Sequence, residues 1–454
     1  MKEKIFKAYD VRGIYPDELD EEAAFKIGAA FVTFLGKKNI VIGRDMRRSS
    51  DALSDSLAAG INYRGGKVID IGLCSTDMVY FAVAKYKHDG GIMITASHNP
   101  PQYNGMKFVR ENAIPIGEDS GLEQIKDIVV RDKELQGAYS SKTKPTDAIK
   151  KQVLVEFRKH VLSFIDIDKI KPLKIIVDAG NGMAGLTAPE IFSELKCKVI
   201  PMCFELDGSF PDHQPDPLVP ENRVKIESRM KKGDLDLGIA FDGDADRCFF
   251  IDDKGKFVPG DFITALLAEH FLKKNKGKKD SVSKVIYDVR ASWAVRDIVH
   301  KSGGVPLVNR VGHAFFKQRM RDEKAVFGGE VSGHYYFRDN FNADSGIIAA
   351  LVLIGILSDS GKKLSELVSR FKDYHVSGEI NSTVQDKDAA IAKLKEKYSD
   401  AKQYFIDGIS VEYDDWHFNV RKSNTEPLLR LNLEAKSSKL MKQKTDEVLG
   451  VIRS

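Results

Sequence analysis

Three stretches of this chain share one pattern: a short β-branched run that ends in a polar or glycine-bearing loop and leads into a helical pattern. They are NIVIGRDMR (39–47), LKIIVDAGNG (173–182) and SKVIYDVRAS (283–292). Strands that alternate with helices form sheets that are covered by helices on both faces. The pattern therefore predicts three mixed α/β sheet domains in series.

The last part of the chain has a different pattern. The segments GEINSTVQ, GISVEYDDWHFNVRKSN and LLRLNLEAKS alternate apolar and polar residues. Such alternation indicates a half-exposed antiparallel sheet, and hence a smaller α+β domain at the C-terminus.

Three stretches are candidate domain boundaries: LQGAYSSKTKPTDAIKK (135–151), the hairpin-like CFFIDDKGKFVPGD (248–261), and the end of the helical LSELVSRFKDYH (364–375). A chain of 454 residues is also too long for one hydrophobic core. We therefore expect four domains, at 1–150, 151–254, 255–370 and 371–454.

Composition excludes several classes of function. Lys and Arg total 70 against 66 Asp and Glu, so the chain has no overall field that would favour nucleic acid or membrane. The four cysteines form no CxxC pair, which fits a reduced compartment better than a disulfide framework or a zinc site. The start has no apolar signal region, and the longest apolar run (346–357) is shorter than the roughly 20 residues of a membrane span. These features predict a soluble cytoplasmic protein.

One acidic motif points to a metal ion. In LGIAFDGDADRCFF (237–250) an apolar strand opens into Asp242, Asp244 and Asp246 at alternate positions. These hard oxygen ligands favour Mg²⁺ or Ca²⁺, but the EF-hand template fails because Arg247 stands where that loop requires glycine. Such a metal keeps open positions that a phosphate oxygen can fill, which indicates phosphoryl chemistry. The alternative is a solvated acidic turn.

A second motif, TASHNP (95–100), places Ser97 in a polar loop after an apolar run. In open α/β sheets, function collects in loops at the carboxyl ends of strands. The simpler interpretation is a turn or a helix cap before Pro100.

Two further loops contain groups that suit a sugar phosphate. VRKSNTEPLLR (420–430) combines hydroxyls, amides and guanidinium groups, as a phosphate dianion requires. VFGGEVSGHYYF (326–337) presents Glu330, Ser332 and His334 among glycines, which suits vicinal sugar hydroxyls. A polar turn or a hairpin turn would explain either loop taken singly.

Together with FKAYDVRG (6–13), NGMKF (104–108), DAGNGMAG (178–185) and VGHAFFK (311–317), these motifs resemble the α-D-phosphohexomutases, specifically the phosphomannomutase/phosphoglucomutase group. The resemblance extends over essentially the whole chain. It implies four domains around a central cleft, with Ser97 as a phosphoserine. It also implies that Asp242, Asp244 and Asp246 hold Mg²⁺, with the phosphoserine supplying a further oxygen.

The resemblance also implies roles for other residues. Arg12 and Arg247 would offset charge on the transferring group. His98 and Lys107 are the candidate proton carriers, and which of them is the base stays open; cations around Lys107 would favour its losing a proton. The implied substrate contacts are Tyr9, Arg290, His313, Glu330, Ser332 and His334, with Arg421, Ser423, Asn424, Thr425 and Arg430 as the clamp for the non-reacting phosphate.

The implied activity is interconversion of hexose 1-phosphate and hexose 6-phosphate through a hexose 1,6-bisphosphate, with glucose or mannose 1,6-bisphosphate as activator. Asn424 favours the mannose/glucose group over a phosphoglucosamine mutase, where glycine is usual. A phosphatase, or a non-catalytic sugar-phosphate-binding protein on the same scaffold, is a further alternative, although the latter would be expected to lack Ser97 or an aspartate. Val331 and Arg290 depart from the family's usual methionine and lysine. We expect small-molecule hexose phosphates as partners, and a monomer or weak homodimer.

Overall fold

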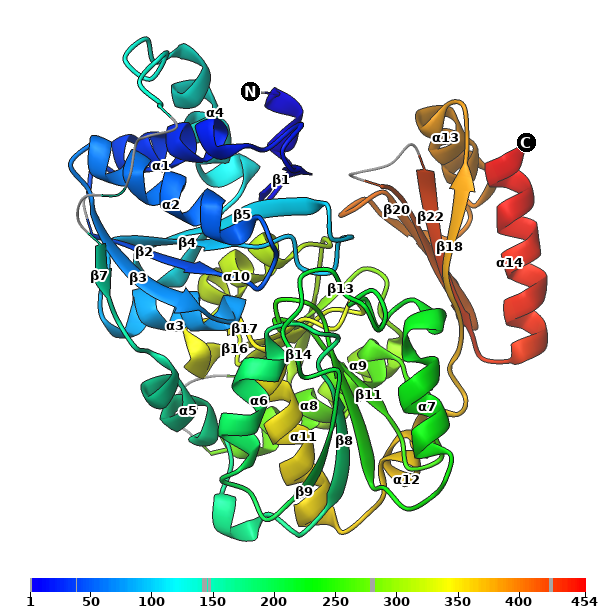
Figure 1. The fold of residues 1–454 in the computed structure, drawn as a ribbon. Helices are drawn as coiled ribbons and strands as arrows, with labels where there is room; N and C mark the ends of the chain where they lie inside the picture. Colours follow the sequence, from blue (N-terminus) through cyan, green and yellow to red (C-terminus); the bar gives the residue numbers. More distant parts are fainter. Residues whose placement is uncertain (1, 38, 141–144, 146–147, 278–281, 424–427) are drawn as a thin grey trace. The chain divides into compact units, whose positions relative to one another are not determined.

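The computed structural model describes residues 2–37, 39–140, 145, 148–277, 282–423 and 428–454 (Figure 1). The chain forms two compact units. Unit 1 comprises Met1–Val258 and Ser332–Leu364, and unit 2 comprises Pro259–Val331 and Ser365–Ser454. In the part of the chain that is described, no helix combines the length and apolarity that a membrane span requires.

The first sheet of unit 1 has the order β1-β5-β4-β2-β3-β7, with β6 paired to β5. Its strands are β1 (Val11–Ile14), β2 (Asn39–Arg44), β3 (Lys67–Leu73), β4 (Gly90–Ile94), β5 (Tyr103–Arg110), β6 (Ile114–Ile116) and β7 (Ala148–Lys150). Apolar residues of α1 (Glu21–Leu35), α2 (Ser50–Tyr63) and α4 (Leu122–Arg131) share one core with this sheet, and α3 (Thr76–Lys85) packs against β2 and β4. Within the stretch 135–151, which was predicted as a domain boundary, residues 148–150 form strand β7 and pair in parallel with β3.

The second sheet of unit 1 has the order β12-β11-β10-β8-β9. Its strands are β8 (Lys174–Asp178), β9 (Lys198–Met202), β10 (Leu237–Phe241), β11 (Cys248–Ile251) and β12 (Phe257–Val258). The antiparallel pair β11–β12 confirms the hairpin predicted in 248–261. Around this sheet lie α5 (Leu154–Leu162), α6 (Ala184–Phe192), α7 (Val224–Met230) and α11 (Gly346–Ser360). The longest apolar run is therefore the largely buried helix α11.

The two sheets of unit 1 each present a polar loop at the end of a wholly buried strand. β4 reads GGIMI and is buried at all five positions, and Ser97 follows it. β10 reads LGIAF, is buried at all five positions, and Asp242 follows it. The apolar strand interiors and the polar residues after them account for the positions of both loops at strand ends.

Unit 2 begins with a parallel arrangement in which β13 (Lys284–Asp288) pairs with β14 (Val305–Asn309) and with β15 (Phe327–Gly329). The helices of this first part of unit 2 are α8 (Gly260–Asn275), α9 (Trp293–Lys301) and α10 (His313–Asp322). The antiparallel pair β16 (Tyr335–Phe337) and β17 (Ala343–Asp344) belongs to unit 1. Helix α12 (Leu364–Val368) begins at the boundary between the units.

The C-terminal sheet of unit 2 is antiparallel throughout, in the order β18-β22-β21-β20-β19. Its strands are β18 (His375–Thr383), β19 (Lys402–Tyr404), β20 (Ile409–Glu412), β21 (Trp416–Lys422) and β22 (Leu428–Ala435). Alternate residues such as Trp416, Phe418 and Val420 enter a core that α13 (Lys387–Lys397) and α14 (Ser438–Arg453) complete. This confirms the α+β domain predicted from the alternation.

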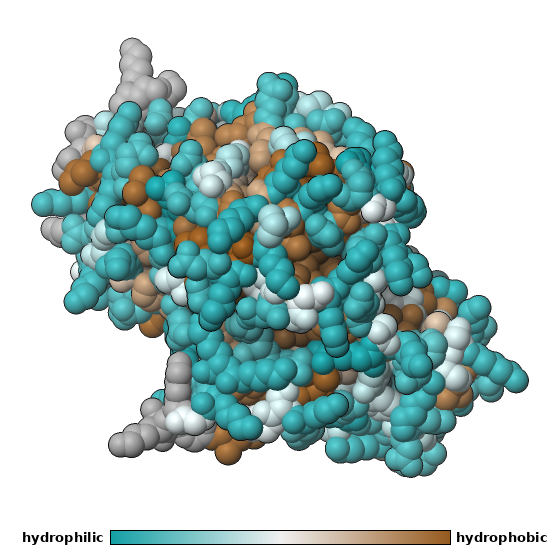
Figure 2. All heavy atoms as spheres, turned by 90° about the horizontal axis from the view of Figure 1, so that it is seen from below, coloured by the Kyte–Doolittle hydropathy of each residue, from teal (hydrophilic) through white to brown (hydrophobic). Residues whose placement is uncertain are grey.

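Figure 2 shows hydrophilic residues over most of one face, with apolar residues scattered between them. The exposed large apolar side chains, such as Tyr63, Val130, Val224 and Phe405, come from different elements. All four cysteines are free thiols.

Candidate active site

Ser97 lies in the loop after β4, and its hydroxyl is the centre of a cluster in unit 1. Its Oγ donates a hydrogen bond to Asp242 Oδ2 at 2.6 Å, lies 3.3 Å from His98 Nδ1, and accepts from Arg247 Nη2 at 3.4 Å. The Ser97 backbone has φ +50°, and its N–H donates to Thr95 Oγ1 at 2.8 Å. A non-glycine residue at positive φ is uncommon and is concentrated at functional sites. The turn thus holds one hydroxyl beside a carboxylate and a guanidinium.

The three aspartates that follow β10 are buried and close together. Asp242, Asp244 and Asp246 each offer a carboxylate oxygen, and these atoms lie within 4.8 Å of one another. Within the described residues, Asp244 Oδ1 is buried without a hydrogen-bond partner, while Asp244 Oδ2 accepts from Thr76 Oγ1 at 2.6 Å. A divalent cation with a preference for oxygen ligands fits this set, because it would satisfy the unfilled oxygen and offset the mutual repulsion.

A glycine allows the two loops to meet. Gly243 stands between the first two aspartates, and a Cβ at its position would lie 2.4 Å from the carbonyl oxygen of Ser97. No side chain fits there without displacing the backbone. The serine loop and the aspartate loop are therefore in direct backbone contact.

Lys107 on β5 is one of two cations paired with the aspartates, the other being Arg247, whose Nε lies 2.9 Å from Asp242 Oδ2. Lys107 Nζ lies 2.7 Å from Asp244 Oδ2 and 2.5 Å from Asp246 Oδ2. Burial alone would lower the pKa of Lys107, but the aspartates outweigh burial and raise that pKa above its usual value. The expectation that cations surround Lys107 is wrong, since anions surround it and keep it protonated.

His98 has the opposite electrostatic environment. Burial, together with the charges of Arg247 and Arg12, holds the pKa of His98 well below its usual value. Arg12 on β1 donates from Nη1 to Asn99 Oδ1 at 2.5 Å and from Nη2 to Asp10 Oδ2 at 2.5 Å. His98 is therefore neutral near pH 7 and has a lone pair that can accept a proton.

Arg47, in the loop after β2, holds the backbone of the serine loop. It was not among the residues predicted from the sequence. Its guanidinium donates four hydrogen bonds of 2.6–2.9 Å to the backbone carbonyls of Ser97, Asn99, Pro100 and Tyr103. The carboxylate of Asp45 lies 3.3 Å from Arg47 Nε, and both side chains are fully buried. The planar, multi-donor guanidinium can hold several carbonyls at once, which an ammonium cannot do in the same geometry.

Unit 2 contains a second charged cluster, on its antiparallel sheet. Arg421 on β21 and Arg430 on β22 are direct cross-strand partners, so two like charges face each other. Glu379 on β18 lies between them: Arg421 Nη2 donates to Oε2 at 2.9 Å, and Arg430 Nη1 lies 3.2 Å from Oε1. Arg290 Nη1 is 3.7 Å from Glu379 Oε2. Three guanidinium groups around one carboxylate form an environment suited to an anion.

Arg290 and Glu330 are held by the loops of the parallel sheet in unit 2. Arg290 donates from Nε and Nη2 to both carboxylate oxygens of Asp288, at 3.0 and 2.8 Å. Glu330 Oε1 accepts from the Gly312 N–H at 2.9 Å, and His313 is the first residue of α10. These side chains occupy loops next to β13, β14 and β15.

The remaining predicted residues are placed as follows. Ser332 Oγ lies 3.1 Å from His334 Nδ1, and His334 Nε2 lies 3.6 Å from Asp246 Oδ1, so His334 lies beside the aspartates in unit 1. Tyr9 is half-buried just before β1, and Ser423 is buried just after β21. The predicted Asn424 and Thr425 lie outside the described residues.

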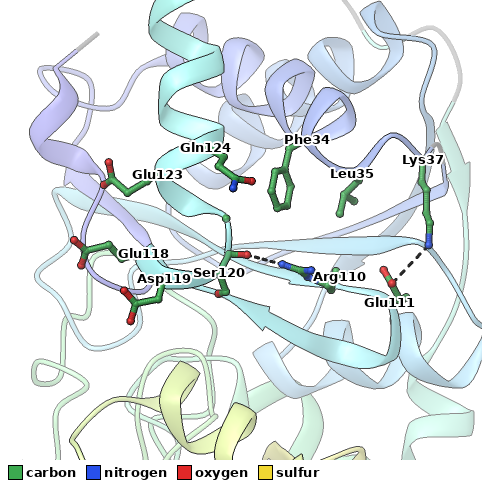
Figure 3. A pocket seen from close by; sticks show the side chains of 11 residues that line it. Phe34, Leu35, Lys37, Arg110, Glu111, Glu118, Asp119, Ser120, Glu123 and Gln124 are labelled. Carbon is green, nitrogen blue, oxygen red and sulfur yellow. Dashed lines mark hydrogen bonds and ion pairs between the residues drawn. The ribbon is translucent and has the colours of Figure 1, made fainter.

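A hollow of about 490 Å³ elsewhere in unit 1 has the wrong charge for a phosphate (Figure 3). Its acidic lining residues are Glu111, Glu118, Asp119 and Glu123. Of its two cations, Lys37 lies 3.6 Å from Glu111, and Arg110 donates to the Ser120 carbonyl at 2.5 Å. The excess of carboxylates would repel an anionic ligand.

Models of the phosphoglucomutase/phosphomannomutase family match four consecutive segments. The three alpha/beta/alpha domains I, II and III match residues 3–136, 155–255 and 259–374. The C-terminal domain matches residues 379–451.

Curated relatives match over the full length. The chain is 44% identical to the phosphohexose mutases of Xanthomonas campestris pv. campestris and 41% identical to a phosphomannomutase of Escherichia coli, with 99% of both chains covered in each case. The chain belongs to the phosphoglucomutase/phosphomannomutase family. A crystal structure of a family protein from Burkholderia thailandensis superposes with a TM-score of 0.88, at 32% identity over 100% of this chain and 97% of the other. The protein is accordingly an enzyme of the phosphohexomutase class.

Two residues of these clusters in the phosphohexomutase, Arg47 and Glu379, were not predicted from the sequence. Arg47 follows a predicted strand in GRDMR, so its place at a strand end was a usable signal. Glu379 lies in an alternating strand where a polar residue is expected, and a register shift between Val376 and Glu379 sets its place opposite Asn432. Nothing in the local sequence indicates that two arginines on other strands meet it.

Proposed function

We propose that this phosphohexomutase interconverts the 1-phosphates and 6-phosphates of mannose and glucose through a phosphoserine at Ser97 and a hexose 1,6-bisphosphate. The observation that carries this proposal is the Ser97 hydroxyl, which lies 2.6 Å from an aspartate of the buried cluster at a positive-φ turn. A serine beside such a cluster is suited to covalent phosphoryl transfer.

In the first half-reaction the free hydroxyl of the sugar phosphate attacks phosphorus, the bond between phosphorus and Ser97 Oγ breaks, and the hydroxyl proton passes to a base. In the second half-reaction Ser97 Oγ attacks the phosphorus of the other phosphate, and the bond between that phosphorus and the sugar oxygen breaks. The sugar oxygen takes the proton back from the base, and the product leaves with one phosphate. The lowered pKa of His98 leaves its imidazole neutral, whereas the raised pKa of Lys107 keeps its ammonium charged. This difference supports His98 as the proton acceptor. Arg12 and Arg247 would offset charge on the transferring group.

We assign Mg²⁺ to the aspartate cluster, with an oxygen of the phosphoserine as a further ligand. A phosphoryl group adds about −1.5 to −2 charge next to three carboxylates, and Lys107 and Arg247 are already paired with those carboxylates. When bound, Mg²⁺ would supply charge neutralisation for the transferring group.

We assign the non-reacting phosphate to the C-terminal sheet. Arg421 and Arg430 provide two guanidinium groups, Ser423 lies at the end of the same strand as Arg421, and Asn424 and Thr425 would complete the clamp. Arg290, His313, Glu330 and Ser332 would contact the sugar, with Tyr9 and His334 as further contacts. The corresponding domains are proposed to be 1–150 (phosphoserine), 151–254 (metal), 255–370 (sugar) and 371–454 (phosphate).

A coupled assay tests the function. Mannose, glucose and glucosamine 1-phosphates are each offered with Mg²⁺, with and without glucose 1,6-bisphosphate. Glu330 and Ser332 are assigned to hydroxyls that mannose and glucose share, and a site that does not read the 2-hydroxyl discriminates weakly. We expect kcat/KM for mannose and glucose phosphates within about 10³ of each other, and stimulation by the bisphosphate. Turnover of glucosamine 1-phosphate alone would replace this assignment with a phosphoglucosamine mutase.

A further inference from the structure

A second group of metal-ligating side chains lies outside the aspartate cluster. Asp178, Cys203 and His213 each offer one ligand atom, and these atoms lie within 4.8 Å of one another in unit 1. Asp178 is the last residue of β8 and is in register with Met202, the last residue of the parallel strand β9. Cys203 therefore follows directly at the same edge of the sheet, where ligand sites of α/β sheets form.

Hydrogen bonds orient the side chains of His213 and Asp178 toward each other. His213 Nδ1 lies 3.0 Å from the carbonyl oxygen of Gln214, so Nδ1–H donates to that carbonyl and Nε2 faces Asp178 Oδ2 at 3.0 Å. The other oxygen, Asp178 Oδ1, accepts from the Gly180 N–H at 3.0 Å. An imidazole whose second nitrogen donates to a carbonyl, next to a carboxylate oriented by a backbone amide, is the arrangement that surrounds metal ligands.

The donor types select the metal. A thiolate and an imidazole are soft or borderline ligands that favour Zn²⁺, whereas Mg²⁺ prefers oxygen ligands and keeps several waters. We propose that Asp178, Cys203 and His213 form a Zn²⁺ site with three protein ligands and a fourth position for water. The sequence favoured no zinc site because the cysteines form no CxxC pair, but the fold brings together three ligands from separate segments.

The proposed site would anchor a loop that touches the serine loop. The residue after His213, Gln214, donates from Nε2 to the carbonyl of His98 at 3.0 Å. The ring of Phe210, in the same segment, lies 5.0 Å from the guanidinium of Arg47. A metal bound at Cys203 and His213 would therefore fix both ends of the segment that contains Phe210, and would hold Gln214 directly after its second end. This proposal is independent of the proposed substrate and mechanism.

Cobalt spectroscopy tests the thiolate ligand directly. Metal-free full-length protein is titrated with Co²⁺ in the absence of substrate, and the thiolate-to-cobalt charge-transfer absorption is followed. The aspartate cluster contains no sulfur, so it cannot produce this band. We expect the band to saturate at one equivalent, to vanish when Zn²⁺ is added, and to be absent in Cys203→Ser. Cys197→Ser is the matched control: Cys197 is also partly buried, but its Sγ lies against the Lys171 carbonyl, and the band should persist.

Zinc stoichiometry provides a second readout. In an Asp244→Asn background, which weakens the aspartate cluster, equilibrium dialysis should still find one Zn²⁺ per chain, and Cys203→Ser should remove it. His213→Gln should weaken Zn²⁺ binding at least tenfold, and circular dichroism establishes whether each variant is folded. A folded wild-type protein without the cobalt band, or Zn²⁺ binding unchanged by Cys203→Ser, would overturn the proposal and leave His213 as an imidazolium paired with Asp178.

Discussion

The charged clusters of the two units have opposite charge patterns: one has a cation between two anions, and the other has an anion between two cations. In unit 1 a single ammonium, Lys107, lies between Asp244 and Asp246, whereas in unit 2 a single carboxylate, Glu379, lies between Arg421 and Arg430. Like charges brought together in a fold require an internal partner of opposite sign. The two partners differ in exposure: the Lys107 side chain is 4% exposed and that of Glu379 is 28% exposed.

This difference indicates different roles. The buried Lys107 is paired with two carboxylates. If its side chain moved away, both carboxylates would be left without a cation in a low-dielectric interior. Glu379 has access to water, so it could turn outward if the proposed phosphate bound to the arginines, because a phosphate carries more negative charge than a carboxylate. We therefore expect large and structural effects from changes in the first cluster, and small effects on substrate affinity from changes in the second.

The largest effect is expected for Asp244→Asn. The variant loses a carboxylate of the aspartate cluster to which we assign Mg²⁺, so kcat should fall by about 10³-fold or more and metal affinity should drop. Steady-state kinetics and isothermal titration with Mg²⁺ measure both quantities. Asp234→Asn, which removes an exposed aspartate paired with Arg229, is the control and should leave both unchanged. Full activity of Asp244→Asn, or of the wild type in excess chelator, would refute a metal role for the cluster.

Lys107→Gln should be the most destabilising of these changes. It leaves two buried carboxylates without their cation, which costs about 3–5 kcal/mol of unfolding free energy. Because a divalent cation can replace the lost charge, added Mg²⁺ should raise Tm more in this variant than in the wild type. Lys159→Gln, which removes an exposed lysine paired with Glu156, should show neither effect. Equal stabilisation of both proteins by Mg²⁺ would mean that Lys107 and the metal do not share the same carboxylates.

Arg47→Lys tests how a buried cation acts through a neighbouring loop. The ammonium cannot keep four carbonyl contacts, so the serine loop should loosen and kcat should fall by about 10²-fold with little change in KM. Arg44→Lys is the matched control, since Arg44 lies three residues earlier and pairs with the exposed Asp51. A rise in KM with unchanged kcat would place Arg47 in substrate binding instead of positioning Ser97.

The smallest effect is expected for Glu379→Gln. Removing the competing carboxylate should lower KM for the hexose phosphate about fivefold, since partly exposed ion pairs contribute about 1 kcal/mol. Unit 2 offers a control in Glu412→Gln, where a carboxylate of similar exposure pairs with Arg296. If KM instead rises in Glu379→Gln, the carboxylate orders the arginines for phosphate and does not compete with it.

The sequence predicted those features that depend on neighbours along the chain. Ser97 and Asp242 each follow a short apolar run, and the alternation in the C-terminal segments set the antiparallel sheet. The environment of Lys107 was predicted with the wrong sign, because its partners lie 137 and 139 residues away. Glu379 and strand β7 were missed for related reasons: a register shift between β18 and β22 places the first, and pairing with β3 orders the second within a polar stretch.

We propose that Ser97 carries the phosphoryl group during turnover. The most direct measurement is intact-mass spectrometry with peptide mapping after incubation of the purified protein with glucose 1,6-bisphosphate and Mg²⁺. We expect one phosphoryl group per chain, on Ser97. In a folded Ser97→Ala variant we expect neither this phosphoryl group nor mutase turnover. A phosphoryl group on another residue, or near-native turnover of Ser97→Ala, would show that Ser97 is not the phosphoryl carrier.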